Sequence, residues 1–211
     1  RRRIATAAAA VVLLGVGTYG YVRVPAEAPR CAAEPAALAG AWDDERREAL
    51  AGAFAASDLP YAADTGRYAR GRLDAWAARW GAARLAACEA THVTRTQPES
   101  VLALRQACLE RQRKDLAAVA GLLVEGRAEA IERADRMIAS LPAPEACDDV
   151  EALGRLPPPA DPRTGAAVDA VRDELAAVRA LRHAGRYAEG VPRAEQARAA
   201  AEATGYAPVL A

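Results

Sequence analysis

Few side chains in this 211-residue sequence are of the types and spacing that catalysis or metal binding requires. The two histidines, His92 and His183, have no partner at ligand spacing, and the four cysteines form no Cys-x-x-Cys pair. Asp64-Thr65-Gly66 has the letters of an aspartic-protease motif, but it begins a predicted helix and lacks a second aspartate motif. The sequence therefore predicts no catalytic residue, no metal site and no cofactor in this chain.

Disulfide formation is the chemistry that remains for the four cysteines. An even number of cysteines is typical of two disulfides when a protein lies outside the cytoplasm. Of the three possible pairings, we expect Cys88 with Cys108, on the facing arms of a predicted helical hairpin, and Cys31 with Cys147, before and after a helical bundle. The alternative is four small buried thiols, because two of the cysteines lie on apolar helix faces.

Two further patterns resemble ligand sites but have simpler interpretations. Residues 15–22 fit the glycine-rich loop of dinucleotide-binding proteins and also that of protein kinases. Pro25, however, interrupts the helix that a dinucleotide site needs, and no other kinase motif follows. We interpret these glycines as part of a membrane helix. Asp148, Asp149 and Glu151 lack the ligand pattern of a calcium loop, so we interpret them as charges at the start of a helix.

The N-terminal residues predict a single membrane-spanning helix. An uncharged run, residues 4–22, follows a basic flank at 1–3 and precedes a linker at 23–40. At 1.5 Å per residue this run spans roughly 28 Å, which is close to the hydrocarbon thickness of a bilayer. The arginine bias predicts a cytoplasmic N-terminus and an extracytoplasmic bulk in the inner or plasma membrane. A cleaved signal peptide, with Ala26-Glu27-Ala28 as its cleavage motif, and a buried core helix are the alternatives.

The apolar spacing beyond this run predicts an all-α protein. Hydrophobic residues make up 52% of the sequence but aromatic residues only 5%, and 28 Lys and Arg balance 28 Asp and Glu, which argues against nucleic-acid binding. Apolar residues recur at helical spacing over four segments, about 42–56, 62–91, 96–126 and 129–141. We expect them to form a four-helix-type bundle over residues 41–155.

Several side chains of this bundle have predictable places. Trp76 and Trp80 lie four residues apart on one helical stripe, so we expect them to fill the core rather than to line a ligand groove. Thr96 and Glu99 have the spacing of a capping box. We interpret Arg111, Arg113 and Lys114, which nearby Glu110 and Asp115 balance, as a solvated helix surface.

The C-terminal residues predict a helical repeat. After a proline-rich linker at 156–164, residues 165–211 show a helix, a Gly-x-Tyr turn and a second helix, which is the profile of a tetratricopeptide repeat. Its signature residues are Gly185, Tyr187 and Ala197; Val178, Gly190 and Pro192 depart from the pattern. One repeat cannot bury its faces alone, so we expect either further repeats or packing against the bundle.

Five short motifs occur in order after the predicted membrane helix: Ala41-Trp42-Asp43, Ala87-Cys88-Glu89-Ala90-Thr91, Arg105-Gln106-Ala107-Cys108-Leu109, Cys147-Asp148-Asp149-Val150-Glu151-Ala152-Leu153 and Ala184-Gly185-Arg186-Tyr187-Ala188-Glu189. This order resembles the region that follows the kinase domain in large bacterial transmembrane serine/threonine protein kinases with C-terminal tetratricopeptide repeats. The resemblance implies that a cytoplasmic kinase domain, which would hold ATP and magnesium, precedes this chain.

It also implies a function without catalysis for the chain itself. By this resemblance the chain is a membrane-anchored sensor that binds protein or peptide ligands outside the cell, self-associates, and relays association through the single span. The alternative is a membrane-tethered repeat scaffold or adaptor with no kinase attached.

Overall fold

The computed structural model describes residues 31, 35–155 and 158–209, and all of their regular elements are helices. The all-α prediction is therefore confirmed for this part of the chain, with no strand in it. The predicted membrane helix at 4–22, its basic flank and the glycine-rich residues 15–22 lie outside the described residues. Within the described ranges, no helix is both long enough and apolar enough to cross a bilayer.

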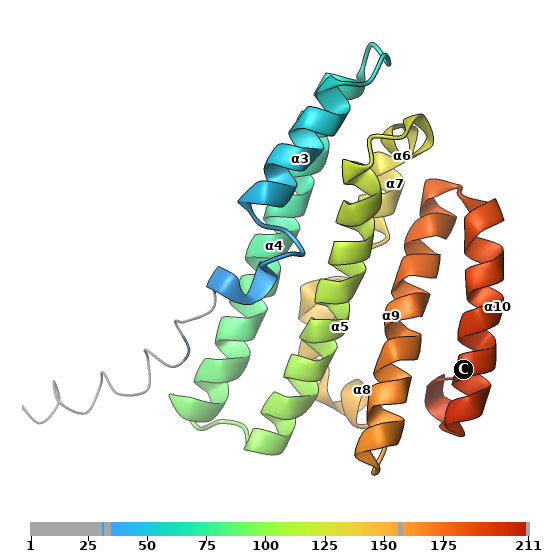
Figure 1. The fold of residues 1–211 in the computed structure, drawn as a ribbon. Coiled ribbons are helices and arrows are strands. Elements are labelled where there is room, and N and C mark those ends of the chain that lie inside the picture. The colour runs from blue at the N-terminus through green and yellow to red at the C-terminus, as the bar shows by residue number, and fades with distance from the viewer. Residues whose placement is uncertain (1–30, 32–34, 156–157, 210–211) are drawn as a thin grey trace, which may run out of the picture.

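Five long helices build the described part of the molecule. They are α3 (Asp44–Ala55), α4 (Ala62–His92), α5 (Glu99–Val124), α9 (Pro162–Ala184) and α10 (Tyr187–Thr204). Shorter elements are the 3₁₀ helices η1 (Pro35–Leu38), η2 (Pro144–Asp148) and η3 (Ala207–Val209) and the α-helices α6 (Ala128–Glu132), α7 (Ala134–Ala139) and α8 (Val150–Gly154). Figure 1 shows α4, α5, α9 and α10 side by side in that order, with α3 packed against α4 and α5. The segment from α6 to α8 covers the other side of α4 and α5.

Two of the predicted helices differ from those in the structure. The predicted helix at 129–141 is two short helices, α6 and α7, because Arg133 leaves helical geometry at φ −109° and ψ 9°. The predicted capping box is wrong, because α5 begins at Glu99 with Pro98 in an extended conformation before it. A proline disfavours helical geometry in the residue before it, so the helix cannot begin at Thr96, whose hydroxyl donates instead to the Ala90 carbonyl at 3.3 Å.

Helix α9 has clear local signals at both ends. The Asp161 carboxylate accepts hydrogen bonds from the backbone N–H of Thr164 at 2.8 Å and from its hydroxyl at 2.9 Å, and Pro162 occupies the first turn. Gly185 ends the helix in the left-handed region at φ +77°. Val168 and Val171 of this helix are buried.

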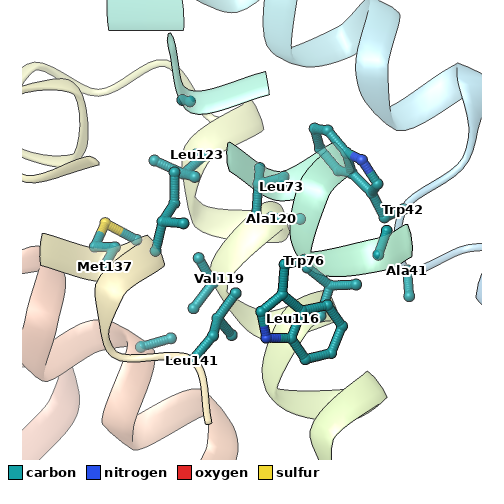
Figure 2. Close-up of a cluster of buried hydrophobic side chains, with 14 of the residues drawn as sticks. Ala41, Trp42, Leu73, Trp76, Leu116, Val119, Ala120, Leu123, Met137 and Leu141 are labelled. Atoms are coloured by element: carbon teal, nitrogen blue, oxygen red, sulfur yellow. The ribbon is translucent and has the colours of Figure 1, made fainter. Parts of the chain in front are cut away.

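The core is built around three tryptophans, whose exposed fractions are 1% for Trp42, 3% for Trp76 and 1% for Trp80. Figure 2 shows Trp76 beside Leu116, with further buried side chains from α4, α5, α7 and the segment after it. Each indole N–H has an acceptor: Asp74 Oδ1 at 2.8 Å for Trp42, the Pro142 carbonyl at 2.9 Å for Trp76, and the Leu109 carbonyl at 2.8 Å for Trp80. The prediction that Trp76 and Trp80 fill the core is confirmed.

The C-terminal helical hairpin packs directly against the bundle. Helix α9 lies along α5, and α10 lies on the far side of α9 (Figure 1). Ala180 and Ala184 of α9 belong to the same hydrophobic cluster as the tryptophans. The sequence allows this hairpin to bury its inner face against further repeats or against the bundle. The structure shows packing against the bundle.

Replacing Gly66 with alanine is expected to lower the free energy of unfolding by about 1–3 kcal/mol, because a Cβ there would lie 2.9 Å from the Cβ of Phe54. A matched control is Gly71 on the same helix, where a Cβ meets nothing within 4 Å. Gly71→Ala is expected to stabilise the protein by about 0.5–1 kcal/mol through helix propensity. Urea unfolding of both variants measures the difference, and equal stabilisation by the two would contradict the close packing of α3 on α4.

Candidate functional site

Two disulfides join elements that are distant in sequence, which confirms that the cysteines form disulfides. Cys31 is bonded to Cys88 and Cys108 to Cys147, each with a Cα–Cα distance of 5.6 Å. The predicted pairing, Cys31 with Cys147 and Cys88 with Cys108, is therefore wrong. Cys31, Cys108 and Cys147 are buried, with exposed fractions of 2%, 9% and 0%.

The register of the α4–α5 hairpin explains the error. The hydrogen bond from the Trp80 indole to the Leu109 carbonyl places the two residues at one level of the hairpin. Cys108 is next to Leu109, whereas Cys88 lies eight residues along α4 from Trp80, which is about 12 Å of helix axis. A disulfide requires Cα atoms within about 7 Å, so facing arms alone do not bring Cys88 and Cys108 together.

The Cys108–Cys147 disulfide is one of several attachments that fix the segment from Pro142 to Asp148 against α4 and α5, and the Arg79–Glu145 ion pair, at 3.6 Å, is another. The Gln112 side chain donates to the Ala143 carbonyl at 3.0 Å, and the Trp76 indole donates to that of Pro142. The Arg105 guanidinium, itself only 8% exposed, forms an ion pair with Asp148. The segment is thus a well-anchored wall beside α5.

A groove runs between this wall, α5 and α9. It has a volume of about 370 Å³ and adjoins a second hollow of about 340 Å³ that shares Asp115, Pro142 and Arg179 with it. Its lining consists of Cys108, Arg111, Gln112, Lys114, Asp115, Pro142, Ala146, Arg172, Asp173 and Arg179. Four of these side chains are cationic and two are anionic, so the lining carries an excess of positive charge.

Three of the four cations have carboxylate partners. Lys114 pairs with Asp173 at 2.6 Å and Arg179 with Asp115 at 2.5 Å, and both ion pairs connect α5 to α9. Arg172 pairs with Asp169, one turn earlier on α9, at 3.2 Å.

Arg111 differs from the other three cations of the groove. It is half-buried, and its guanidinium forms no hydrogen bond or ion pair with any residue that the structure describes. Burial lowers the pKa of Arg111, and the neighbouring charge of Arg172 lowers it further. The charges of Asp169 and Asp115 act in the opposite direction. The groove therefore holds one guanidinium that has carboxylates in its neighbourhood but is hydrogen-bonded to none of the described residues.

The interpretation of Arg111, Arg113 and Lys114 as one solvated surface is therefore wrong for two of the three. Arg113 does pair with Glu110 on the same helix, at 2.7 Å. Arg111 and Lys114 instead face α9, which returns to α5 only after some fifty residues of intervening chain. No pattern within α5 indicates this contact, because the charges that complete the groove come from α9.

A third hollow, of about 530 Å³, lies apart from the groove, between the start of α4 and the α6–α7 segment. Its exposed tyrosine Tyr68 accepts a hydrogen bond from Arg72 at 2.6 Å, and Arg72 also pairs with Asp135. Asp64, from the protease-like letters, lies in the first turn of α4 and pairs with Arg67. Two of the three carboxylates in its lining, those of Asp64 and Asp135, are paired with arginines, and the residues that line it include no arginine or lysine, so this hollow is the weaker candidate.

The remaining candidate residues have local structural partners. The Asp149 carboxylate accepts from the backbone N–H of Ala152 at 3.0 Å and so caps α8, and Asp148 pairs with Arg105. Nδ1 of His92 lies 3.5 Å from Oε1 of Glu99. Burial lowers the pKa of His183, and the nearby Arg182 lowers it further. No group of three potential metal ligands occurs within the described ranges.

The repeat-signature residues lie around the turn between α9 and α10. Gly185 ends α9, Tyr187 begins α10 with 60% of its surface exposed, and Ala197 is buried at 2%. The two helices have 23 and 18 residues, which together exceed a whole 34-residue tetratricopeptide repeat. The assignment to that repeat class stays a prediction.

Gly185→Ala is expected to destabilise the protein by about 1–2 kcal/mol, because an L-residue resists φ +77°. Its Cβ would also lie 2.7 Å from Cζ of Arg133, whose guanidinium donates to the Ala184 carbonyl at 3.2 Å. Gly205, at φ +64°, has nothing within 4 Å of its Cβ position and is the control. Thermal unfolding should show a larger loss for Gly185→Ala than for Gly205→Ala; equal losses would mean that Arg133 adds nothing at this turn.

Comparison with known proteins identifies no relative: no protein-family model, no curated protein and no solved structure matches this chain.

Proposed function

We propose that this chain is a non-catalytic, disulfide-stabilised helical module that binds protein or peptide ligands outside the cell, as part of a membrane-anchored serine/threonine protein kinase. The observation that carries the extracytoplasmic location is the pairing of all four cysteines in two disulfides. Such disulfides persist in oxidising compartments and are rare in the cytosol. The kinase connection rests on the order of the short motifs.

Exposed apolar side chains on α10 support the binding part of the proposal. Tyr187 and Val191 lie four residues apart on this helix and expose 60% and 56% of their surfaces. Residues at this spacing share one helix face, and aromatic side chains are enriched where proteins bind one another. Helix α10 packs on α9 through Gly190, Ala197 and Ala201. The side chains of Tyr187 and Val191 take no part in this packing and remain available to a partner.

The compartment is tested by alkylating thiols in intact cells before lysis and then mapping tryptic peptides without reduction. Arginines separate the four cysteines, which fall on peptides 31–46, 85–95, 106–111 and 137–155. We expect 31–46 linked to 85–95, and 106–111 linked to 137–155. Four alkylated thiols would contradict the proposal and would favour a membrane-tethered scaffold inside the cell.

The kinase connection is tested separately by the reading frame upstream of Arg1. We expect it to encode the catalytic-loop and magnesium-binding motifs of a protein kinase. A frame without these motifs would favour the scaffold with no kinase attached.

A further inference from the structure

We propose that the groove between α5 and α9 binds the carboxylate of a small organic acid, with Arg111 as its principal ligand. The inference does not rest on the proposed function, since it is argued only from the residues that line the groove and the contacts that hold them.

The first argument is that the guanidinium of Arg111 forms no hydrogen bond or ion pair with any described residue, although Asp169 and Asp115 lie in its neighbourhood. A guanidinium presents its N–H donors in a planar fork that fits a carboxylate through two parallel hydrogen bonds. In this groove the fork of Arg111 has no partner among the described residues, whereas Lys114 and Arg179 already hold aspartates. Arg172 adds a second positive charge close by, which its ion pair with Asp169 offsets in part, and an anion between the two arginines would relieve the repulsion that remains.

The second argument concerns the charge of the ligand. Asp115 and Asp173 also line the groove, although each is paired with a cation. Because the other three cations of the groove already have aspartate partners, a carboxylate monoanion matches the one guanidinium without an ion pair, whereas a phosphate dianion would carry one negative charge more than it can match. The modest excess of positive charge therefore favours a singly charged ligand.

The third argument is the apolar part of the lining, which comes from α5 and from the wall. Cys108, Pro142 and Ala146 offer an apolar surface to the body of a ligand, and the disulfide to Cys147 and the Gln112–Ala143 hydrogen bond hold that wall in place. The volume of about 370 Å³ lies near the lower end for small-molecule sites. An aliphatic acid would place its carboxylate on Arg111 and its chain along the wall.

The experiment titrates the full chain with sodium hexanoate and, in parallel, with hexanamide, which has the same shape without the charge. NMR of the indole N–H groups reports the location, because the Trp76 indole donates to the Pro142 carbonyl in the lining, whereas Trp42 donates to Asp74 outside it. We expect hexanoate to shift the Trp76 signal with a Kd of about 1 mM and to leave that of Trp42 in place.

Variants then identify the ligand residue. Arg111→Gln is expected to weaken hexanoate binding roughly 10–100-fold, and Arg111→Lys, which keeps the charge but lacks the fork, to weaken it less. Arg198→Gln is the matched control, because Arg198 is an exposed arginine on α10, paired with Glu202 outside the groove. We expect it to bind hexanoate as the unchanged chain does. Arg111→Gln should keep the Tm or raise it, since it removes a half-buried charge without a partner.

Three outcomes would overturn the inference. Equal binding of hexanamide and hexanoate would reduce the site to an apolar hollow, and a stronger response to inorganic phosphate would assign it to that ion instead. Unchanged hexanoate binding by a folded Arg111→Gln variant would remove Arg111 from the site. The comparison of hexanoate with hexanamide needs no variant, so it decides the matter even if Arg111→Gln fails to fold.

Discussion

Trp80→Ala is expected to lower the free energy of unfolding by about 3–5 kcal/mol. The side chain is 1% exposed between α4 and α5, and its removal would leave a large cavity at the centre of the bundle. It would also remove the hydrogen bond from the indole to the Leu109 carbonyl, which contributes about 1 kcal/mol. The loss is a large fraction of the 5–15 kcal/mol that is typical of folded domains.

Chemical denaturation followed by circular dichroism measures this loss. Trp80→Phe keeps most of the volume and should cost less than the alanine variant. Tyr187→Ala removes an aromatic side chain that is 60% exposed, and we expect its effect to stay within about 0.5 kcal/mol. A Trp80→Ala variant as stable as Tyr187→Ala would contradict the core that the structure describes.

Removing the Cys108–Cys147 disulfide is the second large effect that we expect. Its cysteines are 39 residues apart, and the loss of that constraint on the unfolded chain corresponds to about 4 kcal/mol. The Cys108→Ala/Cys147→Ala double variant should therefore unfold at a markedly lower urea concentration. It should also bind hexanoate more weakly, because the wall from Pro142 to Asp148 loses one of its attachments.

The other disulfide provides the matched control. Cys31 and Cys88 are 57 residues apart, so the same reasoning gives a similar loss of stability for Cys31→Ala/Cys88→Ala. Neither of these two cysteines lines the groove. Equal weakening of hexanoate binding in the two double variants would show that general loosening, rather than the wall beside Cys108, affects the groove.

Local signals were sufficient for most of the helices. Helix α4 begins at Ala62, as predicted, and ends within one residue of the predicted position, and Gly185 ends α9 as expected. Helical spacing identified Trp76 and Trp80 as core residues, because a four-residue period places both on one face. At Pro98 and Arg133 the backbone is not helical, although both residues lie within segments whose apolar side chains recur at helical spacing.

The sequence by itself determined that this protein is helical, that Trp76 and Trp80 are buried and that its cysteines can form two disulfides, because helical period, helix ends and residue counts are local properties. Only the tertiary structure decided which cysteines pair, since pairing depends on the register of α4 against α5 to within a few ångströms. The groove likewise exists only because α9 packs on α5, which brings Arg111 and Arg172 together from sixty residues apart. Such contacts depend on the shapes and charges of two surfaces at once, and neither helix carries that information alone.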